Sequence, residues 1–202
     1  GNAVILKPAE ATPLSALALA KLAKDAGVPD GILSVLTGAR EDAERIGGTL
    51  LRDARVRKIS FTGSTAVGKQ LYAGCAGTVK RLSLELGGNA PFVVFDDADL
   101  DAAVDGLLVA KFRNAGQTCV AANRILVQRS VFDAFVARLE DRIRGLVVGP
   151  GTAPNVQIGP LIDGRGLAKV EAHVADALAR GGEVVTGGKR HALGRTFFEP
   201  TL

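Results

Sequence analysis

Cys119 is the side chain in this sequence whose type and setting best fit nucleophilic chemistry. It closes the run Phe112–Cys119, in which Arg113 stands six residues before it. A thiol attacks as its thiolate, so a catalytic cysteine needs a base, a cation or a helix N-terminus close by. Upstream, the run Leu84–Asn89 carries Glu85, a carboxylate that burial would make a stronger base. A cysteine on its own is more often a small buried apolar residue, so the prediction depends on these neighbours.

The other reactive side chains form no second constellation. His173 falls within a helical pattern and His191 in a polar loop, so a hydrolase with a Cys/His dyad is poorly supported. Cys75 has no partner at Cys-x-x-Cys spacing and no cluster of His or Cys around it. We therefore predict neither a metal site nor a disulfide framework, as is typical of a protein from the reducing cytoplasm.

The runs Leu84–Gly88 and Gly116–Cys119 together resemble the aldehyde dehydrogenase superfamily, and the longer run Lys111–Val120 is similar to its succinate-semialdehyde dehydrogenases. The likeness extends over essentially all 202 residues. It implies an NAD(P)-dependent oxidation of a small aldehyde, with succinic semialdehyde as the favoured substrate. In that reaction Cys119 would form a thioester and use its backbone N–H to stabilise the oxyanion, Glu85 would activate the hydrolytic water, and Arg113 would bind the distal carboxylate of the substrate.

Two segments are predicted to contact the dinucleotide. Lys7–Glu10 follows the first expected strand, where α/β folds bind ligands. Gly63–Gly68 begins like a phosphate-binding loop, although Gln70 lacks the hydroxyl of a Walker A motif, so its spacing alone is a weak signal. The resemblance places Lys7 and Glu10 at the adenosine ribose and Gly63–Gly68 at the pyrophosphate. The cofactor residues that it implies are Lys7, Pro8, Ala9, Glu10, Gly63, Ser64, Thr65, Gly68 and Leu86.

Glu10 also indicates which cofactor is preferred. An acidic residue at the ribose accepts hydrogen bonds from the hydroxyls of NAD⁺ and repels the 2′-phosphate of NADP⁺. Lys7 acts in the opposite direction, because an ammonium group can pair with that phosphate. We therefore expect a moderate preference for NAD⁺, with NADP⁺ possible.

The composition excludes several other functions. Hydrophobic residues make up 47% and charged residues 23% of the chain, as in ordinary globular proteins. The net charge is only +4, and one Tyr and no Trp are available to stack on bases, so nucleic-acid binding is not expected. No apolar run approaches the roughly 20 residues that span a bilayer, so no membrane segment is expected either.

Strand-like and helix-like segments alternate along the chain, which predicts βαβ units and a parallel sheet. We expect an α/β fold: part of a Rossmann-like cofactor domain over residues 1–86, then the start of an α/β catalytic domain over 87–202. Thr12 and Ser130 are predicted to cap helices, and Val184–Val185 is predicted to be a short strand. Cys119 is expected on a turn after a helix that begins at Asp99. The expected strands are 3–6, 33–36, 57–61, 80–86, 91–95 and 123–128, and the expected helices are 13–27, 41–51, 64–76, 99–112, 130–143 and 163–180.

The chain contains no Met and opens on the apolar run Ala3–Leu6, so we expect an internal fragment of a longer enzyme. The resemblance implies that an oxyanion-binding Asn precedes Gly1, that the fragment alone is inactive, and that the full-length protein forms homodimers or homotetramers. Two alternatives stay open. The enzyme acts on another short aldehyde, with Arg113 in a structural role, or the chain is a non-catalytic nucleotide-binding or interaction fragment.

Overall fold

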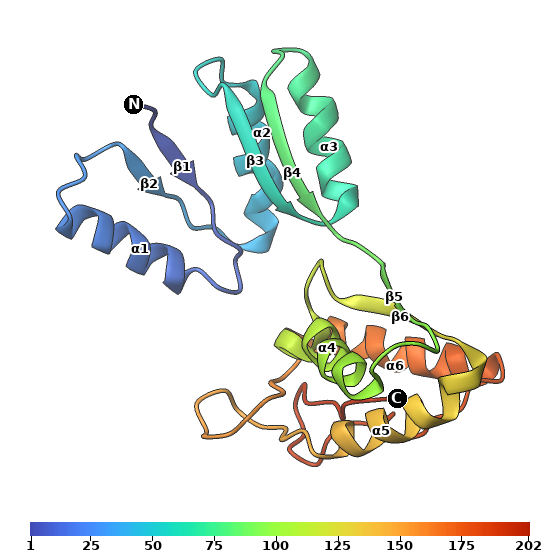
Figure 1. Cartoon of the computed structure of the whole chain (residues 1–202). Coiled ribbons are helices and arrows are strands. Elements are labelled where there is room, and N and C mark those ends of the chain that lie inside the picture. The colour runs from blue at the N-terminus through green and yellow to red at the C-terminus, as the bar shows by residue number, and fades with distance from the viewer. The chain divides into compact units, whose positions relative to one another are not determined.

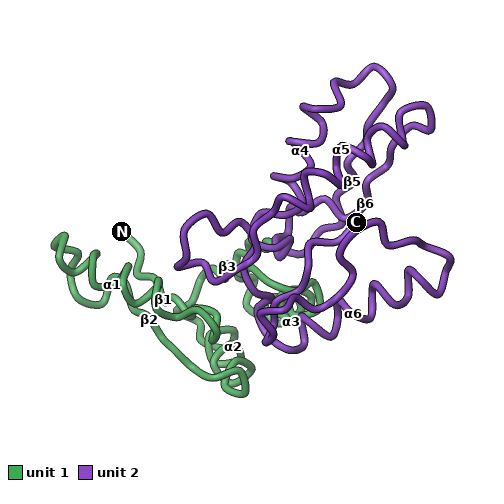
Figure 2. The backbone as a smooth tube through the Cα atoms, turned by 90° about the horizontal axis from the view of Figure 1, so that it is seen from below, with its two compact units in different colours: residues 1–85 green, residues 86–202 purple.

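The computed structural model describes all residues from 1 to 202 and shows a mixed α/β fold with parallel strands. The chain divides into two compact units, Gly1–Glu85 and Leu86–Leu202 (Figure 2). The expected domains, 1–86 and 87–202, differ from these units by one residue. The roles assigned to the domains, cofactor binding and catalysis, stay predictions.

Unit 1 opens with a β-α-β element. β1 (Val4–Leu6) and β2 (Leu33–Val35) pair in parallel, and α1 (Leu14–Asp25) connects them (Figure 1). A separate two-stranded sheet places β3 next to β4. The remaining elements of this part of the chain are η1 (Arg40–Asp42), α2 (Ala43–Arg52), β3 (Lys58–Gly63), α3 (Thr65–Ala76) and β4 (Arg81–Leu86). Strands and helices thus alternate as predicted, but the strands form short separate sheets.

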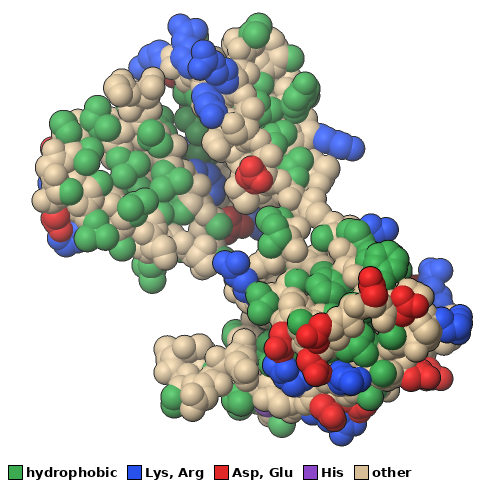
Figure 3. Space-filling view, viewed as in Figure 1, with side chains coloured by type: hydrophobic (Ala, Val, Ile, Leu, Met, Phe, Trp, Pro, Cys, Tyr) green, Lys and Arg blue, Asp and Glu red, His purple; other side chains and the backbone are tan.

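Little of unit 1 is fully buried. Ile46 and Cys75 are its buried hydrophobic residues, and Figure 3 shows many hydrophobic side chains at the surface over α1, β1 and β2. Lys80 is the buried charged residue, only 8% exposed. Its ammonium group donates to the backbone carbonyls of Asp53 and Val56, at 2.7 and 2.6 Å. Those bonds satisfy the buried donor and fix the turn between α2 and β3.

Unit 2 is built on a second β-α-β element with a dense core. Its elements are β5 (Ala90–Val94), α4 (Leu100–Phe112), η2 (Arg113–Gly116), β6 (Ala122–Val127), η3 (Arg129–Val131), α5 (Phe132–Arg144) and α6 (Gly164–Ala179). β5 and β6 pair in parallel, and α4 lies between them in the chain. Buried residues from β5, α4, β6 and α5 pack together: Val94, Val104, Leu107, Ala122, Phe135, Leu139 and Ile143. This core fixes α4, which leads into the segment that carries Cys119.

Local end signals succeeded for some elements and failed for others. Asp99 caps α4 as predicted, by accepting from the backbone N–H groups of Asp101 and Ala102. The predicted caps Thr12 and Ser130 are wrong: α1 starts after Pro13 without a side-chain cap, and a 3₁₀ turn precedes α5. Val184–Val185 is not a strand.

No helix in the structure is both long and apolar enough to cross a membrane. The structure also gathers no group of three or more His, Cys, Asp or Glu side chains that could hold a metal ion.

Candidate active site

Cys119 lies on a turn between η2 and β6, and its side chain is exposed. Its thiol is free, and its backbone N–H makes no hydrogen bond within the chain. The position on a turn after α4 confirms the sequence prediction. An exposed thiol next to an unpaired N–H is the arrangement that an attacking nucleophile with an oxyanion donor requires.

The turn that precedes Cys119 has an unusual backbone. Asn114, Ala115 and Gly116 all have positive φ angles, of 55°, 54° and 74°. Asn and Gly tolerate this left-handed conformation, but for Ala it costs roughly 1–2 kcal/mol. Such strain persists only where surrounding contacts fix the backbone, and it is common at functional sites.

Gln117 supplies several of these contacts. Its amide nitrogen donates to the carbonyl of Asn114 at 3.3 Å, and the Asn114 side chain donates back to the carbonyl of Gln117 at 3.4 Å. Its amide oxygen accepts from the backbone N–H of Ile162 at 2.9 Å. The bond from the Ile162 N–H joins the turn before Cys119 to the segment that leads into α6. Gln117 had no role predicted from the sequence, because a contact between residues 45 positions apart leaves no local signal.

Gly88 also contacts the backbone of this segment. A Cβ atom at Gly88 would lie 2.7 Å from the carbonyl oxygen of Cys119, so the two backbones meet where only glycine fits. A Cβ at Gly87 would meet nothing within 4 Å. The two motifs that were joined in the sequence analysis, Leu84–Gly88 and Gly116–Cys119, thus touch at one point within unit 2.

Glu85 is the next-to-last residue of β4 and belongs to unit 1, whereas Cys119 belongs to unit 2. The Glu85 side chain is exposed, so the partial burial that we expected to strengthen it as a base is absent from this structure. The reactive pair of Glu85 and Cys119 stays a prediction.

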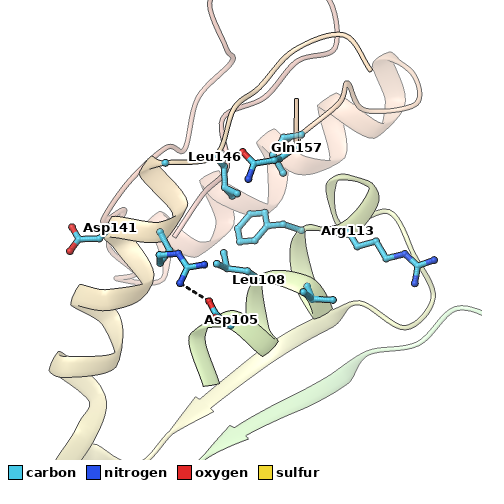
Figure 4. Close-up of a pocket in the computed structure, with 11 residues that line it drawn as sticks. Asp105, Leu108, Arg113, Asp141, Leu146 and Gln157 are labelled. Carbon is cyan, nitrogen blue, oxygen red and sulfur yellow. Dashed lines mark ion pairs between the residues drawn. The ribbon is translucent and has the colours of Figure 1, made fainter. Parts of the chain in front are cut away.

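Arg113 follows the last residue of α4 and begins η2, and its side chain is exposed. It takes part in no ion pair or side-chain hydrogen bond of the chain. Figure 4 shows the guanidinium pointing away from Leu146 and Gln157, which line a hollow of about 500 Å³ beside α4. Of the two structural roles that were the alternative for Arg113, pairing with a local Asp is not found, whereas capping the preceding helix stays open, because Arg113 is the C-cap residue of α4. Its planar donor group is available to an anion.

The first cofactor segment borders a cleft of about 330 Å³ at the carboxyl ends of β1 and β2. Pro8, Ala9 and Glu10 line it from one side, and the segment 37–39 lines it from the other. Lys7 is half-buried, and its ammonium group donates to the carbonyl of Pro8 at 2.7 Å. Residues 37–39 were missed, although their place directly after the second expected strand was a usable signal.

The second cofactor segment joins β3 to α3. The Ser64 hydroxyl caps α3 by accepting from the backbone N–H of Val67 at 3.3 Å, and Thr65 is the first helical residue. At Gly63 a Cβ atom would lie 2.5 Å from the ring of Phe61, and Gly68 is buried. The free N–H groups of this helix start suit a phosphate. Leu86 ends β4. Both segments therefore offer groups of the kind that bind a dinucleotide.

Comparisons with known proteins identify the family of the chain. The model of the aldehyde dehydrogenase family matches residues 1–202. The chain is 58% identical over its whole length to a glutarate-semialdehyde dehydrogenase of Pseudomonas aeruginosa, and 56% identical to the succinate-semialdehyde dehydrogenase of Escherichia coli that is named for NADP⁺. It covers 41% of each of these relatives. The crystal structure of succinate-semialdehyde dehydrogenase from Burkholderia pseudomallei superimposes with a TM-score of 0.95 and 57% identity over 98% of this chain and 41% of that one. The chain belongs to the aldehyde dehydrogenase family.

Proposed function

We propose that the protein containing this chain oxidises succinic semialdehyde, or a closely similar aldehyde with a terminal carboxylate, to the carboxylic acid with NAD(P)⁺. The observation that carries the proposal is the exposed Cys119, which has a free thiol on a strained turn and an unpaired backbone N–H. The names of the two relatives support the substrate class, since each refers to the semialdehyde of a dicarboxylic acid.

In the proposed reaction the Cys119 sulfur adds to the aldehyde carbon, and the aldehyde oxygen becomes the oxyanion of a thiohemiacetal. The backbone N–H of Cys119 has no other partner, so it is free to donate to that oxygen. Loss of hydride from the thiohemiacetal carbon would leave a thioester on Cys119. NAD(P)⁺, which the Lys7–Glu10 and Gly63–Gly68 segments would hold, would supply the hydride acceptor. Glu85 then removes a proton from the water that attacks the thioester carbon, and the Cys119 thiolate leaves as the acid forms.

Arg113 would select the substrate by its charge. Its guanidinium is exposed, unpaired and located at the end of the helix that leads to Cys119. A guanidinium makes two parallel charge-assisted hydrogen bonds to a carboxylate, a geometry that no neutral aldehyde can use. This supports a substrate whose far end is negatively charged.

The cofactor residues would divide the dinucleotide between two places in unit 1. Pro8, Ala9 and Glu10 border the cleft proposed for the adenosine half, with Lys7 beside them. The Gly63–Gly68 segment, with Ser64 and Thr65, is proposed to hold the pyrophosphate through backbone N–H groups. Leu86, which ends β4 and is the first residue of unit 2, is also proposed to contact the cofactor. We propose a moderate NAD⁺ preference from Glu10, although the Escherichia coli relative is named for NADP⁺.

The test uses a full-length protein that contains these residues. Cys119→Ala should abolish turnover, and Glu85→Gln should slow thioester hydrolysis while a first burst of NADH remains. If the Cys119→Ala variant keeps most of its turnover, the cysteine mechanism is wrong. If Glu85→Gln shows no burst and loses activity altogether, Glu85 does not act at the hydrolysis step.

A separate experiment tests the substrate. Arg113→Ala should remove about 2–4 kcal/mol of transition-state stabilisation for succinic semialdehyde and lower its kcat/KM accordingly. The kcat/KM for an uncharged aldehyde of similar length should stay nearly unchanged. Arg129→Ala is a matched control, because Arg129 is exposed in the same unit and also takes part in no ion pair. Equal losses for both substrates would assign Arg113 the structural role and leave another short aldehyde as the substrate.

A further inference from the structure

Lys111 and Asn123 form a contact across the base of the segment that carries Cys119. Lys111 lies in the last turn of α4, and Asn123 is the second residue of β6. The Lys111 ammonium donates to the side-chain oxygen of Asn123 at 2.8 Å. This hydrogen bond therefore joins the two ends of the segment 112–122, whose eleven residues include Cys119.

The Lys111 side chain also lies against the strained turn inside this segment. A Cβ atom at Gly116 would be 3.0 Å from the Lys111 carbonyl and 3.8 and 3.9 Å from Cε and Nζ of the same lysine. Gly116 is thus the point at which the turn rests on Lys111. Asn123 extends the contact in the other direction, since its amide donates to the carbonyl of Gly88 at 3.5 Å, next to the site where Gly88 meets Cys119.

The choice of lysine here has a cost that an apolar residue would avoid. Lys111 is half-buried and takes part in no ion pair, and desolvation lowers the pKa of its ammonium group. A methionine would fill the same space without removing a charge from water. What the ammonium adds is a directional bond to Asn123 that a packing contact does not supply.

We infer that Lys111 is a positioning residue, which acts through Asn123 to fix the segment 112–122 and so the backbone of Cys119. The inference rests on the proposed role of Cys119 as the nucleophile. The Lys111–Asn123 bond lies outside the reacting groups, and its loss should slow the chemical step and leave cofactor binding unchanged.

The test compares Lys111→Met, Asn123→Leu and the double variant in the full-length enzyme. Each single variant should lower kcat about tenfold, with KM for the cofactor within about twofold, because the nucleophile is displaced while the proposed cofactor residues lie outside the segment 112–122. The double variant should be no slower than the slower single variant, since both changes break the same bond. Lys111→Arg, which keeps a cationic donor, should recover part of kcat, and alkylation of Cys119 by iodoacetamide should slow in the variants in parallel with kcat.

Arg138→Met serves as the matched control. Arg138 pairs with Asp101 at 3.1 Å near the other end of α4, so its loss removes a charged contact of the helix far from the Lys111–Asn123 bond. An unchanged kcat in Lys111→Met, or single-variant losses that multiply in the double variant, would overturn the inference. Should Lys111→Met not fold, Asn123→Leu breaks the same bond from its exposed partner and decides alone. Retained activity in Cys119→Ala would instead refute the proposed function, so the two failures are distinguishable.

Discussion

Replacing Gly88 with alanine tests whether close backbone contact sets the position of the nucleophile. The new Cβ atom would lie 2.7 Å from the carbonyl oxygen of Cys119. To reach 3.0 Å, the shortest separation that real Cβ atoms show, the two segments must move apart by about 0.3 Å, and by about 0.7 Å to reach the ordinary 3.4 Å. The obstructing atom belongs to the main chain, so no side-chain rotation relieves the clash.

The size of the effect follows from that displacement. Insertion of a methyl group into a filled space costs about 1–3 kcal/mol of stability. A shift of about 1 Å in a reacting group can lower the rate about a hundredfold, so a shift of roughly half that distance should lower kcat about tenfold. Gly87→Ala is the matched change, because its Cβ atom meets nothing within 4 Å, and we expect its stability within about 0.5 kcal/mol of the wild type.

The assay measures three quantities for both glycine variants of the full-length enzyme: the free energy of unfolding from urea titration, kcat with saturating substrates, and the rate of Cys119 alkylation. Gly88→Ala should lose stability, turnover and thiol reactivity together. If Gly88→Ala and Gly87→Ala lose equal stability, glycine flexibility explains the pair and the contact with Cys119 does not. If Gly88→Ala loses stability but keeps full kcat, the contact supports the fold alone.

Three further predictions concern single side chains. Glu10→Ser should shift the ratio of kcat/KM for NAD⁺ over NADP⁺ towards NADP⁺, because Lys7 then faces the 2′-phosphate unopposed, and a wild type that already prefers NADP⁺ would contradict the assigned role of Glu10. Lys80→Met should lower the free energy of unfolding by about 2–4 kcal/mol, since the carbonyls of Asp53 and Val56 lose their donor, whereas the exposed Lys58→Met should change it by less than about 0.5 kcal/mol. Asp163 caps α6 by accepting from the Gly166 N–H, and this bond together with the one from Arg165 lowers the pKa of its carboxyl group. Its stabilisation is therefore present above the ordinary carboxyl pKa of about 4 and is lost as the pH falls through the lowered folded value, so the urea midpoint should fall less between pH 6 and pH 3 in Asp163→Asn, which caps without titrating; equal falls would contradict this.

The elements of the fold were predictable where their signals are local. Asp99 and Ser64 cap helices with bonds to N–H groups two or three residues away, and both helices begin where the sequence indicates. Thr12 and Ser130 are equally good cap types, but Pro13 and a 3₁₀ turn place the first helical residue elsewhere. The residue type that can cap a helix therefore does not by itself determine at which residue the helix begins.

Val184–Val185 failed for a different reason. The apolar pair predicted a strand, and the segment does bond to the end of the chain: the N–H groups of Val185 and Thr186 both donate to the carbonyl of Leu202. Thr186 and Leu202 exchange one reciprocal pair of backbone bonds, but Val184 makes none, so no ladder of bonds extends over the apolar pair. The hydrophobic pattern indicated that this segment forms hydrogen bonds with another part of the backbone, but which residues pair depends on a partner far away in the sequence.

The site shows the same division. Cys119, Arg113 and the glycine pair could be proposed from the sequence because their motifs are contiguous, and contiguous motifs need no tertiary information. The contacts that hold them span longer distances, 12 residues for Lys111 and Asn123 and 45 for Gln117 and Ile162. Polar residues at such spacings are indistinguishable from surface residues until the fold brings them together.

These contacts have one property in common: each acts on the backbone around Cys119, and none involves its thiol. Gln117 bonds to the carbonyl of Asn114, Gly88 abuts the carbonyl of Cys119, and Lys111 supports the turn at Gly116. A residue that bonded the sulfur would have to release it at every turnover, whereas a fixed backbone stays in place while the sulfur forms and loses its bond to substrate. Under the proposed function, unit 2 therefore supplies the orientation of the nucleophile, and it does so by holding three left-handed residues in a conformation that Ala115 would not adopt unaided.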